Sequence, residues 1–421
     1  MQLPLKFRIV AAVALFTTAL GVYSARSWPA SETGTNFDMY YTAACLVRSG
    51  ASAQIYDVIP PDQNPQQLFA NPRSLFAQTA RAHGISRISL YVYPPTLADL
   101  IVPLAYLPPP AALLLWNVFQ VLMMIALGLM LTRMLDIGFR GAAFAAAAFV
   151  LLFRPTLNTF HWGQVTILLA FLLVLGLWLY ARAHRAAAAV LFALAIAIKL
   201  EPIVIVVPLI AWCDWKTLRS LALWGILLFL GLWGINGGSA VSLYFLHQLP
   251  AMSNGIAADV NRSLGNLFYT WLGGAHPVLS PRELSWLVRA LSALILGYAG
   301  WLSRIRPGLP TVSRRQFEIG LVFLLFACCL SPYSWFYNWA LSAPVVVMLF
   351  RRAWDGRADF LETALLAAFL LSLATSRFQM AMITPVVGVV LGIVVLRRMW
   401  LEQNLADATA PRARLAGVTA S

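Results

Sequence analysis

The stretch Thr35-Asn36-Phe37-Asp38-Met39-Tyr40-Tyr41 opens a long segment between the first and second apolar stretches of the chain, and Tyr93-Pro94-Pro95-Thr96 closes it. Nearly every other connection in this apolar sequence is short, and long connections are usually functional when they do not merely link elements. This one begins with a carboxylate set among aromatic residues. It is therefore the first place to look for chemistry.

The composition is that of a polytopic membrane protein. Of the 421 residues, 60% are apolar and 11% are charged, and the mean hydropathy is +0.75. Stretches near the length of about 20 apolar residues that crosses a bilayer recur from end to end, so no soluble domain of useful size remains. We expect an all-α fold with twelve spans and both termini inside: 7–25, 111–132, 141–154, 165–181, 186–198, 202–213, 219–235, 284–303, 316–331, 335–350, 360–376 and 380–397.

The net charge of +14 reports topology rather than a nucleic-acid partner. With the N-terminus inside, 19 of the 30 cations fall in short cytoplasmic segments, as the positive-inside rule requires. Cys45, Cys213, Cys328 and Cys329 show no disulfide or metal-ligand spacing. Together with the absence of paired Asp or His–carboxylate spacing, this predicts a protein that holds neither metal nor cofactor.

We expect one transmembrane domain over 1–400, followed by a cytoplasmic, disordered tail over 401–421. Residues 26–110 form the first extracytoplasmic loop, and 236–282 form a second outer segment. Inside the first loop, Thr35 or Asn36 caps a helix from about Asp38 to Ser49 that Gly50 stops. Further helices are expected over 62–82 and over 96–107, the latter lying on or dipping into the bilayer. The motif at 199–202, Lys-Leu-Glu-Pro, predicts a broken helix that lines a cavity.

Asp38 is the leading candidate for chemistry. A carboxylate beside the membrane can take a proton from an acceptor hydroxyl as a general base. Acidic residues are also common in the first turn of helices, where they cap the backbone, so the residues alone leave both roles open. The setting suggests an enzyme that works at the membrane surface on a lipid-linked substrate.

Two cations are candidates for binding a phosphate. Lys199 lies among apolar helices, where ionisable residues are usually functional, although a simple ion pair with Glu201 is the alternative. Arg262 lies in an outer segment and is either a phosphate ligand or a solvated loop arginine. Candidates for sugar contacts are Tyr40, Tyr41, Tyr93 and His161, each of which can equally be an ordinary interface residue.

Several motifs in fixed order resemble glycosyltransferase family 87. They are Asn36-Phe37-Asp38-Met39-Tyr40-Tyr41 with Gly50 and Tyr56-Asp57, Tyr93-Pro94-Pro95 with Pro103-Leu104-Ala105 and Leu107-Pro108, Gly163-Gln164, the segment around Lys199, Asn261-Arg262-Ser263, and Ser331-Pro332-Tyr333-Ser334-Trp335. The resemblance covers about 30–350.

The resemblance implies a GT-C fold and a polyprenyl-phosphate-sugar donor, with mannose as the sugar. Members of that family resemble polyprenyl-phosphate-mannose-dependent α-mannosyltransferases that extend phosphatidylinositol mannosides, with an aspartate base that falls on Asp38. It adds Gln164 and Asn261 to the substrate-binding candidates. The family commonly has a histidine after the Ser-Pro motif; here Tyr337 or Asn338 must take its place. The usual Lys-Pro pair is also interrupted by Leu200 and Glu201.

We therefore predict a multi-pass enzyme of the inner (plasma) membrane with its site on the extracytoplasmic face. It would transfer a sugar, with inversion, from the lipid-linked donor to a lipid or glycan acceptor, with membrane lipids as its surroundings. A carrier or flippase for lipid-linked sugars is the main alternative, but the loop at 26–110 has no counterpart in the second half, against the repeats typical of carriers. A non-catalytic subunit of an assembly machine is a third possibility.

Overall fold

The computed structural model describes residues 35–56, 70–86, 88–137, 153–253, 261–272, 278–305, 312–374 and 378–418. Within these ranges the chain is almost entirely helical, and an isolated β-bridge joins Asn261 to Trp335. The predicted all-α class is confirmed.

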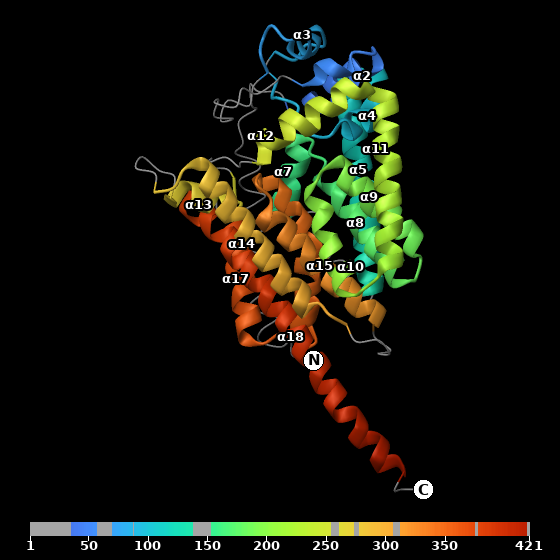
Figure 1. The fold of residues 1–421 in the computed structure, drawn as a ribbon, viewed down its shortest axis with the longest axis vertical. Coiled ribbons are helices and arrows are strands. Elements are labelled where there is room, and N and C mark those ends of the chain that lie inside the picture. Colours follow the sequence, from blue (N-terminus) through green and yellow to red (C-terminus); the bar gives the residue numbers. More distant parts are fainter. Residues whose placement is uncertain are drawn as a thin grey trace.

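The helices between residues 36 and 106 lie at one end of a larger helical bundle (Figure 1), and we call them the outer group. The bounds of all the helices are α2 Asn36–Arg48, η1 Ser52–Ile55, α3 Leu75–Ala82, α4 Pro95–Ile101, η2 Val102–Tyr106, α5 Pro109–Met134, α7 Arg154–Trp162, α8 Thr166–Ala181, α9 Arg185–Ile198, η3 Glu201–Ile205, α10 Val206–Ala211, α11 Trp215–Leu243, η4 Tyr244–Gln248, α12 Leu249–Ser253, α13 Leu264–Leu272, α14 Pro281–Leu302, α15 Val312–Leu330, η5 Phe336–Ser342, α16 Ala343–Trp354, α17 Phe360–Ala374 and α18 Phe378–Val418.

The bundle is built around α15. Its side chains from Leu321 to Cys329 are all buried, and it packs against α8 and α18. In turn α8 packs against α9 and α5, while α9 packs against α11. A helix that is apolar all round belongs inside such a bundle. By contrast, α5 and α11 expose large apolar residues such as Phe119, Ile226 and Leu230, which is the surface that a bilayer covers.

Four helices in the described residues are long and apolar enough to cross a membrane: Pro109–Met134, Trp215–Met252, Arg282–Leu302 and Met382–Leu405. They fall on predicted spans. Other predicted spans coincide with shorter apolar helices such as α8, α9 and α17. The predicted spans 7–25 and 141–154 lie outside the described residues, apart from Phe153 and Arg154. The total of twelve membrane spans therefore stays a prediction.

The outer group follows local sequence rules. α2 begins after Thr35 and ends before Gly50, which has a φ of +77°, as predicted. The predicted helix over 96–107 is two helices, because Pro103 interrupts the backbone ladder and the last turns become 3-10 in η2. Of the predicted helix over 62–82, the described part begins only at Leu75, after Ser74 has capped it, and 62–69 lie outside the described residues.

The break in the bundle is found where Pro202 predicts it. α9 ends at Ile198, Lys199 is extended, and a 3-10 turn leads into α10. At the other end of the chain, α18 continues to Val418, whereas the sequence predicts a disordered tail from 401.

Candidate active site

α2 lies at one end of the bundle (Figure 1), and its first turn carries Asp38. Its carboxylate accepts hydrogen bonds from the backbone N–H and from the hydroxyl of Thr35, the latter at 3.1 Å. Burial raises the pKa of the Asp38 carboxyl above its ordinary value, and the two bonds from Thr35 oppose that rise. Asp38 therefore does cap its helix, and its partly exposed side chain is also a carboxylate of increased basicity.

Two contacts hold the start of α2 against the bundle, and a third bond shares the Gln164 oxygen. Tyr40, two residues after Asp38, donates its hydroxyl to Gln164 Oε1 at 2.8 Å, and Tyr93 donates to the same oxygen at 3.1 Å. Gly163, which ends α7 with a φ of +62°, lies directly against Phe37. The structure therefore brings Tyr40, Tyr93 and Gln164 together, as one buried polar group beside the start of α2.

The interrupted helix carries the next part of the site. The Lys199 ammonium lies 3.0 Å from a carboxylate oxygen of Glu201, donates to Asn338 Oδ1 at 3.2 Å, and sits 5.8 Å from the centre of the Tyr93 ring. Ser331 donates to the same Glu201 oxygen at 3.1 Å. Lys199 thus connects the Tyr93–Gln164 group to η5.

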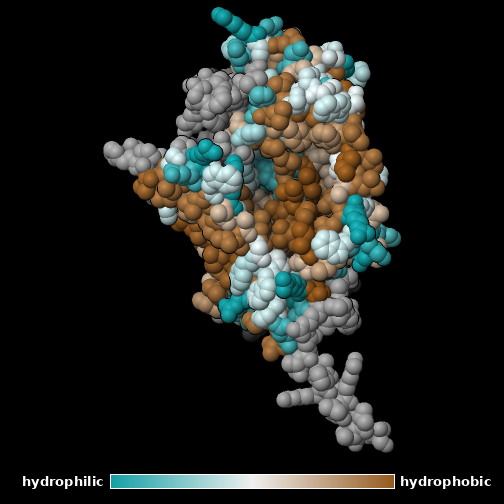
Figure 2. Space-filling model, in the orientation of Figure 1, coloured by the Kyte–Doolittle hydropathy of each residue, from teal (hydrophilic) through white to brown (hydrophobic). Residues whose placement is uncertain are grey.

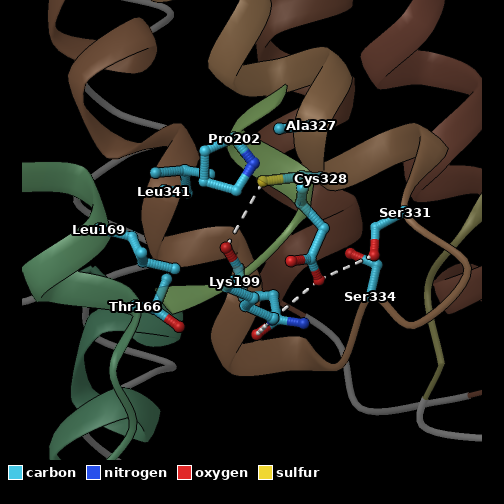
Figure 3. A pocket seen from close by; sticks show the side chains of 11 residues that line it. Thr166, Leu169, Lys199, Pro202, Ala327, Cys328, Ser331, Ser334 and Leu341 are labelled. Carbon is cyan, nitrogen blue, oxygen red and sulfur yellow. Dashed lines mark hydrogen bonds and ion pairs between the residues drawn. The ribbon is translucent and has the colours of Figure 1, made fainter. Parts of the chain in front are cut away.

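These residues line a cavity between α8, α15 and η3 (Figure 3). Thr166 lies on one side of Lys199, while Ser331 and Ser334 lie on the other. The cavity measures about 20 Å³, which is roughly the room that one ordered water needs. The predicted cavity wall at 199–202 is confirmed, but the cavity itself is too small for a sugar ring.

A pair of arginines forms a second cationic group. The guanidinium carbon of Arg262 lies 4.4 Å from the centre of the Phe336 ring, and that of Arg154 lies 5.0 Å from it. Burial and the neighbouring Arg154 charge lower the pKa of Arg262 to about 9, which still leaves the Arg262 guanidinium charged at neutral pH. Two cations on one ring are strongly attractive to an anion.

The backbone places Arg262 there. The Asn261 side chain accepts from Ser334 N at 2.9 Å and donates to the Pro332 carbonyl at 3.0 Å, so it fastens 261–263 to the Ser-Pro-Tyr-Ser-Trp segment. Arg262 is 4% exposed and also donates to the Ser372 carbonyl of α17. Asn261 is therefore used for positioning, and Arg262 is a buried cation rather than a solvated loop arginine.

Not every candidate joins these groups. Tyr41 is buried on another side of α2, where its hydroxyl donates to the Leu107 carbonyl at 2.8 Å and its ring meets His83 edge-on. His161 is exposed at the end of α7 and packs edge-on against Trp162. Two other acidic residues of the predicted outer segments, Asp57 and Asp259, lie outside the described residues.

Sequence reasoning did not single out Arg154 or Phe336 as functional residues. Arg154 is the first residue of a short helix and belongs to no motif. Phe336 directly follows the Ser-Pro-Tyr-Ser-Trp motif and is an apolar residue without chemistry of its own. The only signal for Arg154 is a charge at the start of a short segment that also carries Asn158 and His161. In the described part of the chain, no three His, Cys, Asp or Glu side chains gather at metal-binding distance, and metal independence stays a prediction.

Figure 2 shows that the face in view is hollowed between α13 and α14 on one side and α9 and α11 on the other. The floor of this groove is mainly apolar, and hydrophilic residues appear at the end nearer α7. The fold and the site together define the class: a helical membrane protein with a polar site at one end of an apolar groove.

The model of glycosyltransferase family 87 matches residues 91–332, more than half of the 421-residue chain. The chain therefore belongs to glycosyltransferase family 87 and is a membrane glycosyltransferase. A search of curated proteins finds no match. The matched range includes Tyr93, Gln164, Lys199 and Arg262, whereas Asp38 precedes it.

Proposed function

We propose that this enzyme has a GT-C fold and transfers mannose from a polyprenyl-phosphate-mannose donor to a hydroxyl of a lipid or glycan acceptor. The reaction would take place at the extracytoplasmic face of the inner (plasma) membrane and would need no metal. The observation that carries the proposal is a continuous series of contacts from the start of α2 to η5. Tyr40 and Tyr93 share Gln164, and Lys199 lies over the Tyr93 ring. Lys199 also donates to Asn338 of η5, the element whose Phe336 carries the arginine pair.

The proposed chemistry is a single displacement. The Asp38 carboxylate accepts the proton of the acceptor hydroxyl, and the hydroxyl oxygen forms a bond to the anomeric carbon. The bond from that carbon to the phosphate oxygen breaks on the opposite face, and its electron pair leaves with the polyprenyl phosphate. The configuration at the anomeric carbon is inverted. Burial supports this role of Asp38, because the raised pKa of its carboxyl makes the ionised form a stronger base.

The leaving phosphate gains negative charge during the reaction, and fixed cations stabilise such charge best where water is excluded. Arg154 and Arg262, 9% and 4% exposed, meet that condition, and Lys199 is held in place by Glu201 and Asn338. The contact of Asn338 with Lys199 supports Asn338 as the residue that would replace the missing family histidine. Tyr40, Tyr93 and Gln164 would complete the sugar-binding side.

The apolar groove gives the lipid part of the donor a path that joins the site (Figure 2). A chain of isoprene units gains free energy by leaving water for such a surface. The positive-inside distribution of cations supports the extracytoplasmic side, since it favours the topology in which the first loop is outside.

The test is transfer of labelled mannose from polyprenyl-phosphate-mannose to membrane lipids and glycans, comparing wild type with Asp38→Asn at equal expression. Loss of a general base lowers the rate by about 10²–10⁴-fold, so the variant should be close to inactive. Unfolding of both proteins in detergent is measured alongside, because Asp38 also caps α2.

Asp99→Asn is the matched carboxylate control. Asp99 in α4 is partly buried, burial raises its pKa to about 6, and it is held by Asn236 at 2.8 and 3.0 Å. It should retain transfer. Full activity of Asp38→Asn would contradict the assignment and move the base to Asp99, Asp57 or Asp259. No transfer by wild type under conditions that yield product with another polyprenyl-phosphate sugar would overturn mannose as the substrate.

A further inference from the structure

A second, larger cavity lies at the end of the bundle opposite Asp38. It measures about 410 Å³, many times the roughly 30 Å³ that one water occupies in the liquid. Residues from three junctions line it, and we call it the Trp215 cavity: Tyr180, Arg185, Trp212, Cys213, Asp214, Trp215, Lys216, Arg219 and Gln316.

The Trp215 cavity is separate from the candidate active site. Thr166 at the start of α8 lines the small cavity beside Lys199, and Tyr180 near the end of α8 lines the Trp215 cavity. At 1.5 Å per residue these positions are about 21 Å apart along the helix. α10 and the start of α11 lie in the lower part of the bundle in Figure 1, away from α2 and α4.

The lining of the Trp215 cavity is cationic. Arg185 begins α9, and Lys216 and Arg219 lie in the first turns of α11. The lining holds one carboxylate, Asp214, and that group is already neutralised. It accepts from the Tyr180 hydroxyl at 2.8 Å, from the Thr217 backbone N–H at 3.2 Å and hydroxyl at 2.9 Å, and pairs with Arg185 at 3.3 Å.

Two cations therefore remain available. Lys216 and Arg219 are exposed, and within the described residues no ion pair involves either of them. They are one turn apart on α11, so their side chains lie on the same helix face. Together with Arg185, they surround the opening with positive charge.

The walls of the cavity indicate a membrane setting. Trp215 is 56% exposed, while Trp212 is fixed by stacking on Tyr180 and by donating its indole N–H to the Ser303 carbonyl at 2.9 Å. Exposed tryptophan is typical of the interface level of a bilayer. Trp215 also begins a helix long and apolar enough to cross the membrane.

We propose that the Trp215 cavity binds the phosphodiester headgroup of an anionic phospholipid of the leaflet opposite the active site. Lys216 and Arg219 contact the phosphate, and the lipid tails lie along the exposed apolar face of α11. Basic pockets between membrane helices commonly bind such headgroups. The ligand is a structural lipid rather than a substrate, since the cavity lies about 21 Å along α8 from the candidate active site.

The test uses the full-length protein purified in a neutral detergent, with phosphatidylglycerol as the probe and native mass spectrometry and thermal unfolding as readouts. Wild type should retain and be stabilised by phosphatidylglycerol and not by phosphatidylcholine. In Lys216→Gln/Arg219→Gln, binding should weaken by about 30-fold, since each surface cation contributes roughly a five- to sixfold gain. Both residues are exposed, so the double variant should fold.

Arg133→Gln is the matched control, because Arg133 is an exposed cation in the last turn of α5 that does not line the cavity. It should bind like wild type. Equal stabilisation by phosphatidylcholine, or by inorganic phosphate at the same concentration, would overturn the lipid assignment. So would wild-type affinity in the double variant. These outcomes are independent of mannose transfer, so this proposal and the proposed function can fail separately.

Discussion

At the scale of single residues, Thr35 sets the basicity of Asp38. Its hydroxyl and its backbone N–H both donate to the carboxylate, which favours the ionised form against the effect of burial. A carboxylate that must be ionised to act as a base loses activity as the pH falls through its pKa. The hydrogen bond from Thr35 therefore extends the active range toward acid.

Thr35→Val removes the hydroxyl and keeps the backbone donor. With less stabilisation of the carboxylate, the pKa of Asp38 rises further, so the acid limb of the pH–rate profile of transfer should move to higher pH. The rate on the alkaline plateau should change little. Thr42→Val is the control, because the Thr42 hydroxyl donates to the main-chain oxygen of Asp38 rather than to its carboxylate. A shift to lower pH in Thr35→Val would contradict the role of Asp38.

Lys199 has a structural role and a proposed catalytic role, and a single substitution of Lys199 affects both. Its ion pair with Glu201 is structural, and phosphate binding is proposed. Lys199→Gln should lower transfer by roughly 10- to 100-fold, since a hydrogen bond involving a charged group contributes about 1.5–3 kcal/mol. It should also lower the melting temperature, because Glu201 loses its partner.

The double variant Lys199→Gln/Glu201→Gln separates these effects. Removing both charges restores much of the stability, since no unpaired charge is left in the partly buried site. Transfer should stay low, with a raised KM for the donor. Recovery of both stability and transfer in the double variant would show that Lys199 serves only the ion pair.

At the scale of elements, the turn between α7 and α8 positions the start of α2. Gly163 adopts a φ of +62°, and a Cβ built on it would lie 2.6 Å from the Phe37 Cβ. The same turn carries Gln164, which holds Tyr40 and Tyr93. Any displacement of the turn therefore moves the helix that presents Asp38.

Gly163→Ala should destabilise the protein and lower transfer. The left-handed backbone costs about 1–2 kcal/mol for a residue with a Cβ, and the contact with Phe37 adds roughly 1–3 kcal/mol of overpacking. Gly50→Ala is the matched control, since Gly50 has a φ of +77° with no atom near its Cβ position. Gly50→Ala should lose only the roughly 1–2 kcal/mol of stability that the left-handed backbone costs. Equal losses of melting temperature in the two variants would argue against close packing at Gly163.

The elements that the sequence predicts are those with local causes. Gly50 ends α2, Pro202 breaks the helix after Ile198, and apolar composition identifies α5 and α11. The same rules located Asp38 and Lys199. The arginine pair on Phe336 could not be predicted, because residues from α7, the 261–263 segment and η5 meet only after the bundle packs. Nor could local rules show that Tyr41 faces away from the groups around Gln164.

At the scale of the whole molecule, α17 connects the site to an ionic cluster at the far end of the bundle. The carbonyl of Ser372, near its end, accepts from Arg262, and Glu362, in its first turn, accepts from Arg352 at 2.8 Å. These two positions are about 15 Å apart along the helix. Arg352 and Glu362 are 1% and 2% exposed, and Arg352 also reaches Glu402 of α18 at 3.3 Å.

This buried pair joins α16, α17 and α18, so its loss should affect folding rather than chemistry. Arg352→Leu leaves Glu362 buried and unpaired, which should cost about 3–5 kcal/mol, whereas Arg352→Leu/Glu362→Leu should be much closer to wild type. Glu402 has a second partner, Arg357 at 3.0 Å, which both variants retain.

Thermal unfolding and the rate of transfer per folded molecule are the two measurements. The rate should stay within about twofold of wild type, because neither residue touches the site. A large loss of rate in the stable double variant would instead show that the position of α17 controls Arg262 from the opposite end of the bundle.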